Sequence, residues 1–440
     1  MKFYVVKMGG YTPIFFIFLV FIHRSVTVFL KCVLRNIEIS HDGMTAAPNV
    51  YDAEPIPAEA RAEIDRLLAS GDLFRYTRPQ DAPVALLEQE FAALLGAKYA
   101  LAVSSCSAAL FLSLKALNLP HEARVLIPAF TFAAVPSAVV HADCVPVLVE
   151  VGENYRINME DFAGKLDGSI KAVLISHMRG HTSDMDTIMA LCTAHNVPLL
   201  EDAAHSLGTT WHNRQIGTLG KIGCFSFQSY KLVNAGEGGI LITDDPDLLA
   251  RAVIMSGAYE ENWQKHQGLA EHFAKWQNHL PLYNLRMQNL SAAVIRPQLP
   301  LVAGRVSQGL ANHDYVAGLL NACPVLTVPK PLSPEARAPD SIQFNLPQDW
   351  TDAQALGFQT HAMADGVKVQ IFGLSKGNAR AYWNWKFLAP QPDLPQTRKM
   401  LMRAADMRLP ARLTCADLDY IASTLIKAAM ITAQAPLAAK

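Results

Sequence analysis

The chain has 440 residues, of which 51% are hydrophobic, and its formal net charge is −1. This length and apolar content suffice for one large domain and a smaller one, whereas the near-neutral charge argues against nucleic acid or an acidic membrane surface as a partner. The seven cysteines form no CxxC pair and the fourteen histidines no HExxH motif, which argues against a metal site and favours a reducing compartment.

The first 43 residues differ from the rest. Their longest apolar run, Pro13 to Ile22, ends at His23 and is about half as long as a membrane-spanning helix requires. No small-residue cleavage site of a secretory signal follows it. Two interpretations stay open: a weak membrane anchor, or an upstream extension with translation starting at Met44, where an ordinary soluble sequence begins. We favour the second, and either predicts a cytoplasmic enzyme.

From about Leu87, short β-branched runs alternate with longer amphipathic ones, which predicts a sheet covered by helices. The predicted strands are Tyr99–Val103, Arg124–Pro128, Cys144–Val151, Lys171–Ser176, Val197–Asp202, Gly223–Phe227 and Gly238–Asp245. The predicted helices are Leu87–Gly96, Ser107–Leu117, a segment through Ser137–His141, and Met185–Asn196. We therefore expect a large α/β domain with an N-terminal arm over residues 44–300.

Past about Pro300 this alternation stops. Proline-rich stretches surround two apolar runs, Ser341–Leu346 and Gly366–Phe372, and the chain closes on a predicted helix, Asp417–Ile431. This pattern predicts a smaller α+β domain over residues 301–440.

Three segments that carry polar chemistry each lie at the end of a predicted strand, where α/β sheets bind their ligands. The first, Val103–Leu110, turns from strand to helix with serines at the junction. Free backbone N–H groups and the hydroxyls of Ser105 and Ser107 are suited to hold a phosphate there. The alternative is that a serine only caps the helix.

The second segment, Leu199–Gly208, places Glu201 and Asp202 at a strand end. A carboxylate in a partly dry site needs a cationic partner, and the protonated ring nitrogen of pyridoxal 5′-phosphate is one such cation. The alternative is that Asp202 caps a helix.

The third segment, Cys224–Gly239, places Lys231 between a strand and a glycine-rich turn. A lysine in a desolvated pocket has a lowered pKa and can form an imine with an aldehyde, whereas the alternative is a solvated surface lysine. Ser226 adds a further hydroxyl for a phosphate. The chain order of phosphate cradle, carboxylate and amine favours pyridoxal phosphate bound as a Schiff base on Lys231.

The segments EDAAH, GCFSFQSYK and AGEGGIL resemble signature segments of the DegT/StrS-type aminotransferases. Further stretches resemble the same family in order: Pro128–Val151, Ser183–His205 and Asn284–Leu299. The resemblance covers about Ser70 to Lys427. It implies a fold-type I pyridoxal-phosphate enzyme, with a mixed, mainly parallel sheet in the large domain and a small C-terminal α+β domain.

The resemblance also implies roles for individual residues. Lys231 would bind the cofactor covalently and move a proton, Asp202 would pair with the ring nitrogen, and His205 would sit beside the phenolic oxygen. Phe132 would stack on the ring, while Ser107 and Ser226 would hold the phosphate. A residue from the loop after Ser256–Tyr259 of a partner subunit, for which Asn262 is our candidate, would complete the phosphate site, so that a homodimer is implied.

The chain departs from the family pattern at two places. Cys106-Ser107 stands where the family usually has Gly-Thr, so the backbone of this part of the cofactor site is expected to differ. Arg179 and His181 are unusual in the segment Ser176–Asp186, and we consider both as substrate-binding residues because an arginine can pair with a carboxylate or phosphate. A structural salt bridge is the alternative. Two interpretations stay open for the aromatic side chains of Ala381–Phe387: they stack on a sugar or nucleotide, or they pack in the core, which we favour.

The expected activity is amino transfer from glutamate or glutamine to a keto-sugar, presumed nucleotide-linked, or a similar ketone. One rival is a pyridoxal-phosphate-dependent sugar dehydratase of the same family, in which histidine replaces the lysine. The other is a protein of this fold that has lost catalysis and acts as a regulator.

Overall fold

The structure is a computed structural model, and it describes residues 47–78, 81–266 and 269–434. The prediction for residues 1–43 lies outside these ranges. Within them, no helix is long and apolar enough to span a membrane.

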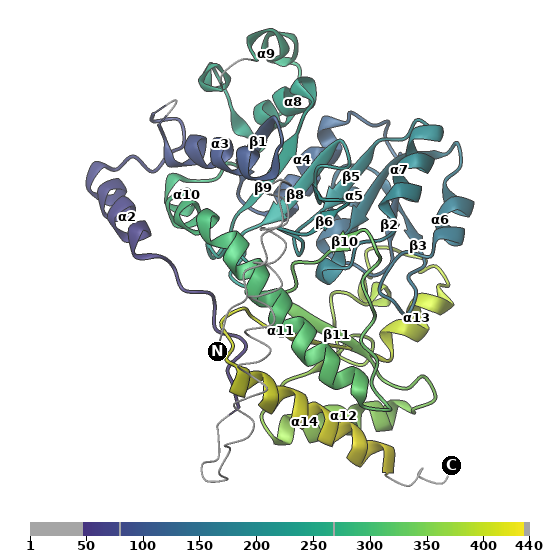
Figure 1. The fold of residues 1–440 in the computed structure, drawn as a ribbon. Helices are drawn as coiled ribbons and strands as arrows, with labels where there is room; N and C mark the ends of the chain where they lie inside the picture. Colours follow the sequence, from purple (N-terminus) through teal and green to yellow (C-terminus); the bar gives the residue numbers. More distant parts are fainter. Residues whose placement is uncertain (1–46, 79–80, 267–268, 435–440) are drawn as a thin grey trace, which may run out of the picture. The chain divides into compact units, whose positions relative to one another are not determined.

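The larger part of the fold is built on a seven-stranded sheet with the strand order β1-β9-β8-β5-β4-β2-β3 (Figure 1). The first four strands along the chain are β1 (Tyr99–Val103), β2 (Arg124–Pro128), β3 (Val145–Val149) and β4 (Ile170–Ser176). The last three are β5 (Leu199–Asp202), β8 (Ile222–Ser226) and β9 (Gly239–Thr243). Only β9 runs against its neighbours, which confirms the predicted mixed, mainly parallel α/β sheet.

Helices cover both faces of this sheet because alternate side chains of each strand point to opposite sides. Leu101 and Val103 of β1 belong to one buried cluster, and Ala100 and Ala102 to the other. The helices that contribute to the first cluster are α4 (Cys106–Ala116), α5 (Ala134–His141) and α8 (Pro246–Gly257). Those that contribute to the second are α3 (Pro83–Leu95), α6 (Met159–Lys165) and α7 (Met185–Ala194).

The helix ends follow the sequence signals closely. Helix α3 ends at Gly96, whose φ of 73° is left-handed and whose N–H donates to the carbonyl of Ala92. Glycine adopts this conformation without steric cost. The predicted C-terminus of this helix is therefore confirmed, while Pro83 at its first position starts it four residues earlier than expected.

The C-terminal part contains a three-stranded antiparallel sheet with the order β11-β13-β12. Its strands are β11 (Ser341–Asn345), β12 (Gln370–Ile371) and β13 (Ala404–Arg408). The helices α11 (Val302–Ala322), α12 (Asp352–Ala364) and α14 (Cys415–Gln434) contribute to a third buried cluster with these strands (Figure 1). This arrangement of helices on an antiparallel sheet is the α+β pattern expected from the sequence.

Further α-helices and short strands lie outside these sheets and clusters or at their margins. They are the helices α2 (Ala58–Ser70), α9 (Ala270–Trp276), α10 (Asn289–Ile295) and α13 (Pro395–Leu401), and the short strands β6 (Thr210–Trp211), β7 (Arg214–Gln215) and β10 (Glu335–Ala336). The three short strands form a small sheet of their own, in the order β10-β6-β7.

The cysteines only partly follow the expectation from the sequence. Five of them, Cys106, Cys144, Cys192, Cys224 and Cys323, are buried free thiols, as expected for small apolar side chains. Cys415 is instead disulfide-bonded. Among the residues that the structure describes, no cluster of histidine, cysteine or acidic side chains is arranged to hold a metal ion.

Candidate active site

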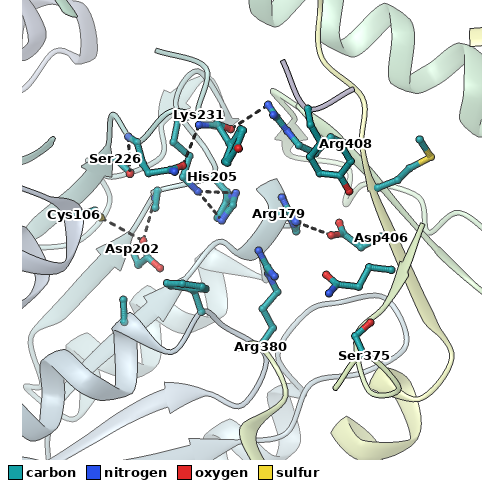
Figure 2. Close-up of a pocket in the computed structure, with 18 of the residues that line it drawn as sticks. Cys106, Arg179, Asp202, His205, Ser226, Lys231, Ser375, Arg380, Asp406 and Arg408 are labelled. Carbon is teal, nitrogen blue, oxygen red and sulfur yellow. Dashed lines mark hydrogen bonds and ion pairs between the residues drawn. The ribbon is translucent and has the colours of Figure 1, made fainter. Parts of the chain in front are cut away.

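A pocket of about 770 Å³ opens at the carboxyl edge of the large sheet. The edge forms because Ser176 at the end of β4 pairs with Asp202 of β5, and Asp202 pairs with Cys224 of β8. The opposite wall includes Asp406 and Arg408 of β13 (Figure 2). The pocket therefore combines residues from both parts of the fold.

Eight of the ten predicted site residues line this pocket. They are Cys106, Ser107, Phe132, Arg179, Asp202, His205, Ser226 and Lys231. His181 and Asn262 do not line it. Asn262 lies on the short helix η2 (Asn262–Lys265) and its Oδ1 accepts a hydrogen bond from Lys265, and its predicted role across a subunit boundary stays a prediction.

Lys231 lies in the turn after β8 and directs its amine into the pocket (Figure 2). Nζ lies 2.9 Å from Nε2 of His205. Burial lowers the pKa of Lys231 to about 8, and burial together with the charge of Lys231 holds the pKa of His205 well below its usual value. The imidazole is thus neutral and accepts a hydrogen bond from the lysine amine, which keeps its own proton at neutral pH.

Asp202 is buried and carries no basic partner of its own. Its oxygens accept hydrogen bonds from Ser176 Oγ at 2.8 Å and from the backbone N–H of Ala204 at 3.1 Å. Among the described residues it forms no ion pair, although its side chain lines the pocket. A buried carboxylate in this situation favours a cation beside it.

The neighbouring Glu201 has a structural role instead. It accepts hydrogen bonds from Nε2 of His177 at 3.0 Å and from the backbone N–H groups of Gly217, Leu219 and Gly220. Its oxygens are therefore satisfied within the fold. Of the two adjacent carboxylates, Asp202 alone is available to a ligand in the pocket.

The N-terminus of α4 forms one end of the pocket. Ser105 caps the helix, because its Oγ accepts the N–H of Ala108 at 3.1 Å, so the capping interpretation is confirmed for this residue. Ser107 is exposed in the pocket. A methyl group on Gly239 would lie 2.2 Å from the Ser105 carbonyl carbon, which shows how closely β9 approaches this turn. The turn leaves free N–H groups and hydroxyls that suit a phosphate.

Cys106 begins α4 and points toward Asp202, with Sγ 4.0 Å from Oδ1 (Figure 2). Burial, reinforced by the charge of Asp202, raises the pKa of this thiol well above its usual value. The cysteine is therefore a neutral thiol. Because it adopts helical geometry, no positive φ is required where the family usually has glycine.

Phe132 is 44% exposed although it is a large apolar ring. It lines the pocket, so this exposed face is open to a ligand. A flat aromatic ring stacks favourably on such a face.

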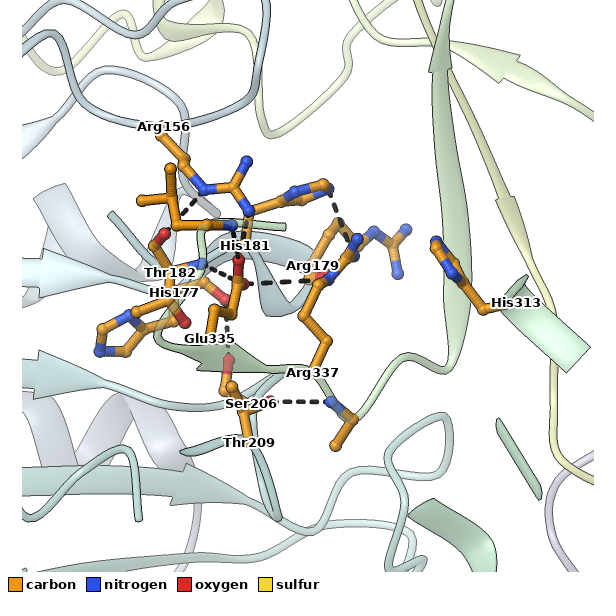
Figure 3. A network of polar contacts seen from close by, with 12 residues as sticks. Arg156, His177, Arg179, His181, Thr182, Ser206, Thr209, His313, Glu335 and Arg337 are labelled. Carbon is orange, nitrogen blue, oxygen red and sulfur yellow. Dashed lines mark hydrogen bonds and ion pairs between the residues drawn. The ribbon is translucent and has the colours of Figure 1, made fainter. Parts of the chain in front are cut away.

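The segment that carries Arg179 is fixed by a buried polar network (Figure 3). Glu335, which is completely buried, forms an ion pair with Arg156 and accepts the N–H of Thr182 at 2.9 Å. Ser206 Oγ donates to the carbonyl of His177 at 3.0 Å. Arg179 itself has a left-handed φ of 57°, and the network stabilises this conformation.

His181 belongs to this network rather than to the pocket wall. It is 2% exposed, and its Nε2 lies 2.8 Å from Oε1 of Gln343. Burial lowers its pKa well below the usual value, so it is a neutral donor to the amide oxygen.

The predicted set missed five charged residues of the pocket: Glu237, Lys368, Arg380, Asp406 and Arg408. Arg380 directly precedes the aromatic segment Ala381–Phe387, in which Tyr382 and Trp385 are each 1% exposed. Core packing is thus confirmed for these two aromatics. Asp406 and Arg408 lie on a strand whose residues are all buried, and no local pattern marks them as pocket residues.

The family model described as "DegT/DnrJ/EryC1/StrS aminotransferase family" matches residues 56–426. The spore coat polysaccharide biosynthesis protein SpsC of Bacillus subtilis (strain 168) is 34% identical over 274 residues, which cover 61% of this chain and 67% of SpsC. A GDP-perosamine synthase of Vibrio cholerae is 32% identical over 49% of this chain and 56% of its own length. The 3-amino-5-hydroxybenzoate synthase of Amycolatopsis mediterranei is 33% identical over 61% of this chain and 64% of its own length. The chain thus spans about half to two thirds of these relatives.

Solved structures show the same fold. The crystal structure of 3-amino-5-hydroxybenzoic acid synthase matches with a TM-score of 0.75 and 24% identity, over 87% of this chain and 99% of that one. The aminotransferase TlmJ from Streptoalloteichus hindustanus matches with a TM-score of 0.74 and 22% identity, over 88% of this chain and all of that one.

Proposed function

Because the chain belongs to the DegT/DnrJ/EryC1/StrS aminotransferase family, its enzyme class is that of an aminotransferase, and we propose that it uses pyridoxal 5′-phosphate bound at Lys231. One observation carries the proposal: a desolvated lysine amine and a buried carboxylate without a cationic partner, Asp202, face the same pocket. We further propose that glutamate or glutamine is the amino donor and a keto-sugar or similar ketone, such as a nucleotide-linked one, is the acceptor.

The residues present fit the cofactor. Lys231 would hold its aldehyde carbon. Asp202 would face its ring nitrogen, whose proton would supply the positive charge that this carboxylate lacks among the described residues. Ser107, Ser226, Cys106 and the free N–H groups of α4 would surround the phosphate. When bound, the cofactor supplies an electron sink that stabilises negative charge on the substrate carbon.

The chain's own residues divide the remaining work. Asp202 is held in place by hydrogen bonds from Ser176 Oγ and from the backbone N–H of Ala204. The face of Phe132 orients a flat ring. Lys231, with a pKa of about 8, can both release and accept a proton near neutral pH, as a general acid-base catalyst requires. His205 lies within hydrogen-bonding distance of that amine and holds it in place.

The cellular setting and the assembly belong to the same proposal. We place the enzyme in the cytoplasm as a homodimer, with Asn262 of one subunit reaching the phosphate site of the other. The dimer rests on the resemblance to the family, and Asn262 does not line the pocket of its own chain.

The dehydratase rival is disfavoured because Lys231 lies in the pocket where that type has histidine. An absorbance scan of the purified protein tests the proposal against the inactive rival. We expect pyridoxal phosphate to give a visible band that disappears on borohydride reduction and leaves a mass increment on Lys231. Glutamate or glutamine should bleach the band and a keto-sugar should restore it, whereas Lys231→Ala should show neither change. If pyridoxal phosphate gives a band that no amino donor bleaches, the aminotransferase proposal is wrong and the inactive regulator is the interpretation that remains.

A further inference from the structure

Three arginines gather on one side of the pocket. Figure 2 shows Arg179, Arg380 and Arg408 on the side of Lys231 away from Cys106 and Asp202. The charges of all three act on His205 and contribute to its lowered pKa. Because the phosphate cradle lies at the other end of the pocket, these arginines face the space left for the substrate.

Arg179 is already paired within the protein. Its Nη2 donates to Oδ2 of Asp406 at 2.6 Å, and Oδ1 of the same carboxylate accepts from Nε2 of Gln343 at 2.9 Å. Gln343 is in turn held by His181. Asp406, which is only 4% exposed, is thereby held on Arg179 by a chain of hydrogen bonds, and this arginine is neutralised.

Arg380 and Arg408 have no such partner among the described residues. Neither forms an ion pair, and Nε of Arg380 and Nη1 of Arg408 are buried without a hydrogen-bond partner. Arg408 is 8% exposed and contacts Tyr230, whose ring centroid lies 4.8 Å from its Cζ. Arg380 packs near Phe132, with 5.7 Å from Cζ to the ring centroid.

Both guanidinium groups keep their charge at neutral pH. Burial lowers the pKa of Arg380 only to about 10, and burial also lowers the pKa of Arg408. The acidic groups whose fields reach them are Asp340 for both, Asp406 for Arg380 and Glu54 for Arg408. A buried cation, Arg408, and a partly buried one, Arg380, without hydrogen-bonded anions are costly unless a ligand compensates them.

We propose that Arg380 and Arg408 form an oxyanion-binding subsite, and that the ketone acceptor carries a carboxylate or a phosphate that binds there. The inference rests on the proposed function. In an aminotransferase the donor and the acceptor occupy the same pocket in turn. A donor carboxylate would compensate the pair only in the first half-reaction, so a neutral acceptor would leave both arginines unpaired in the second. It follows that both the amino donor and the ketone acceptor carry an acid group that binds to these arginines.

Direct binding to the holoenzyme tests this subsite, because the bound cofactor fills the phosphate cradle. Glucose, glucuronate and glucose 6-phosphate serve as calorimetric probes that share one ring and differ in charge. We expect at least one of the two anions to bind at least roughly tenfold more tightly than glucose, and the preferred anion identifies carboxylate or phosphate. Arg380→Gln and Arg408→Gln should each weaken that anion by roughly ten- to a hundredfold, as expected for a charged hydrogen bond, and should remove its advantage over glucose.

The control Arg61→Gln removes the same charge from an exposed position on α2 and should leave the preference intact. Asp406→Asn should act in the opposite direction and tighten anion binding, because it frees Arg179. If Arg408→Gln lowers the melting temperature strongly, Arg380→Gln decides, since its guanidinium makes no hydrogen bond to the protein in the described chain.

Equal binding of all three probes, or an anion preference that survives both arginine variants, would overturn the subsite. This failure is distinct from failure of the proposed function. A protein that loads pyridoxal phosphate on Lys231 and accepts neutral ketones as well as acidic ones keeps its function and loses the subsite. If the cofactor does not load, the titrations are made on the chain without it, and the loss of anion binding in Arg380→Gln and Arg408→Gln separates binding at the arginines from binding in the empty phosphate cradle.

Discussion

The amine of Lys231 lies 2.9 Å from Nε2 of His205, and both groups are buried in the same pocket wall. Since burial lowers the pKa of Lys231 to about 8, the amine holds its proton below this pH and is free to attack an aldehyde above it. We expect the rate of pyridoxal phosphate loading to rise roughly tenfold or more between pH 6.5 and 8.5. Stopped-flow absorbance measures this rate, with hexylamine as the reference for an unperturbed amine. A midpoint near that of hexylamine would contradict the desolvation of Lys231.

Asp202→Asn removes the charge that the pocket offers to the cofactor ring. We expect the turnover number to fall roughly a hundredfold or more, because breaking a buried ion pair costs about 3–5 kcal/mol. Ser176→Ala is the matched control: it removes one hydrogen bond to the same carboxylate but leaves the charge, so the loss should be far smaller. Steady-state kinetics with glutamate would show the difference. Similar losses in both variants would mean that orientation and not charge is the contribution of Asp202.

Gly239→Ala is expected to disturb the turn before α4. The added methyl would lie 2.2 Å from a backbone carbon of Ser105 and 2.3 Å from the N atom of Cys106, so either β9 or the start of α4 must move. We expect the dissociation constant of pyridoxal phosphate to rise roughly tenfold or more, since overpacking costs about 1–3 kcal/mol. Gly304→Ala, in helix α11 with nothing within 4 Å, should bind the cofactor normally and melt at a higher temperature. Unchanged binding in Gly239→Ala would show that this contact is not needed.

Glu335→Gln tests the buried network that supports Arg179. Glu335 is fully buried between Arg156 and Arg337, and its neutralisation leaves buried arginine charge uncompensated. We expect the free energy of unfolding to fall by about 3–5 kcal/mol, measured by urea denaturation. Glu153→Gln breaks an ion pair with Lys399 in which both side chains are at least half exposed, and its effect should be small. Equal effects of the two substitutions would contradict a structural role for the network.

The sequence alone determined the order of the strands and helices along the chain, because apolar periodicity and glycine signals are local. The strands Tyr99–Val103 and Arg124–Pro128 have the predicted bounds. The same local pattern placed Asp202 at the end of a strand and Lys231 shortly after another. Because parallel strands end at a common edge of the sheet, both residues were expected at one site. For this reason the residues predicted for the cofactor, apart from Asn262, line one pocket.

Tertiary structure decided what lies opposite Lys231. Arg408 and Asp406 come from a strand more than 170 residues further along the chain than Lys231, and their contacts with the large sheet leave no periodic trace in the sequence. The local pattern left Glu201 and Asp202 equivalent and the family resemblance pointed to Asp202, while the fold gives the physical reason, because backbone N–H groups satisfy Glu201. Likewise, Arg179 and His181 look equivalent in sequence, but the left-handed turn at Arg179 directs one side chain to the pocket while His181 hydrogen-bonds Gln343 in the interior. Pairing between distant charges depends on three-dimensional distance, and a linear pattern does not carry that distance.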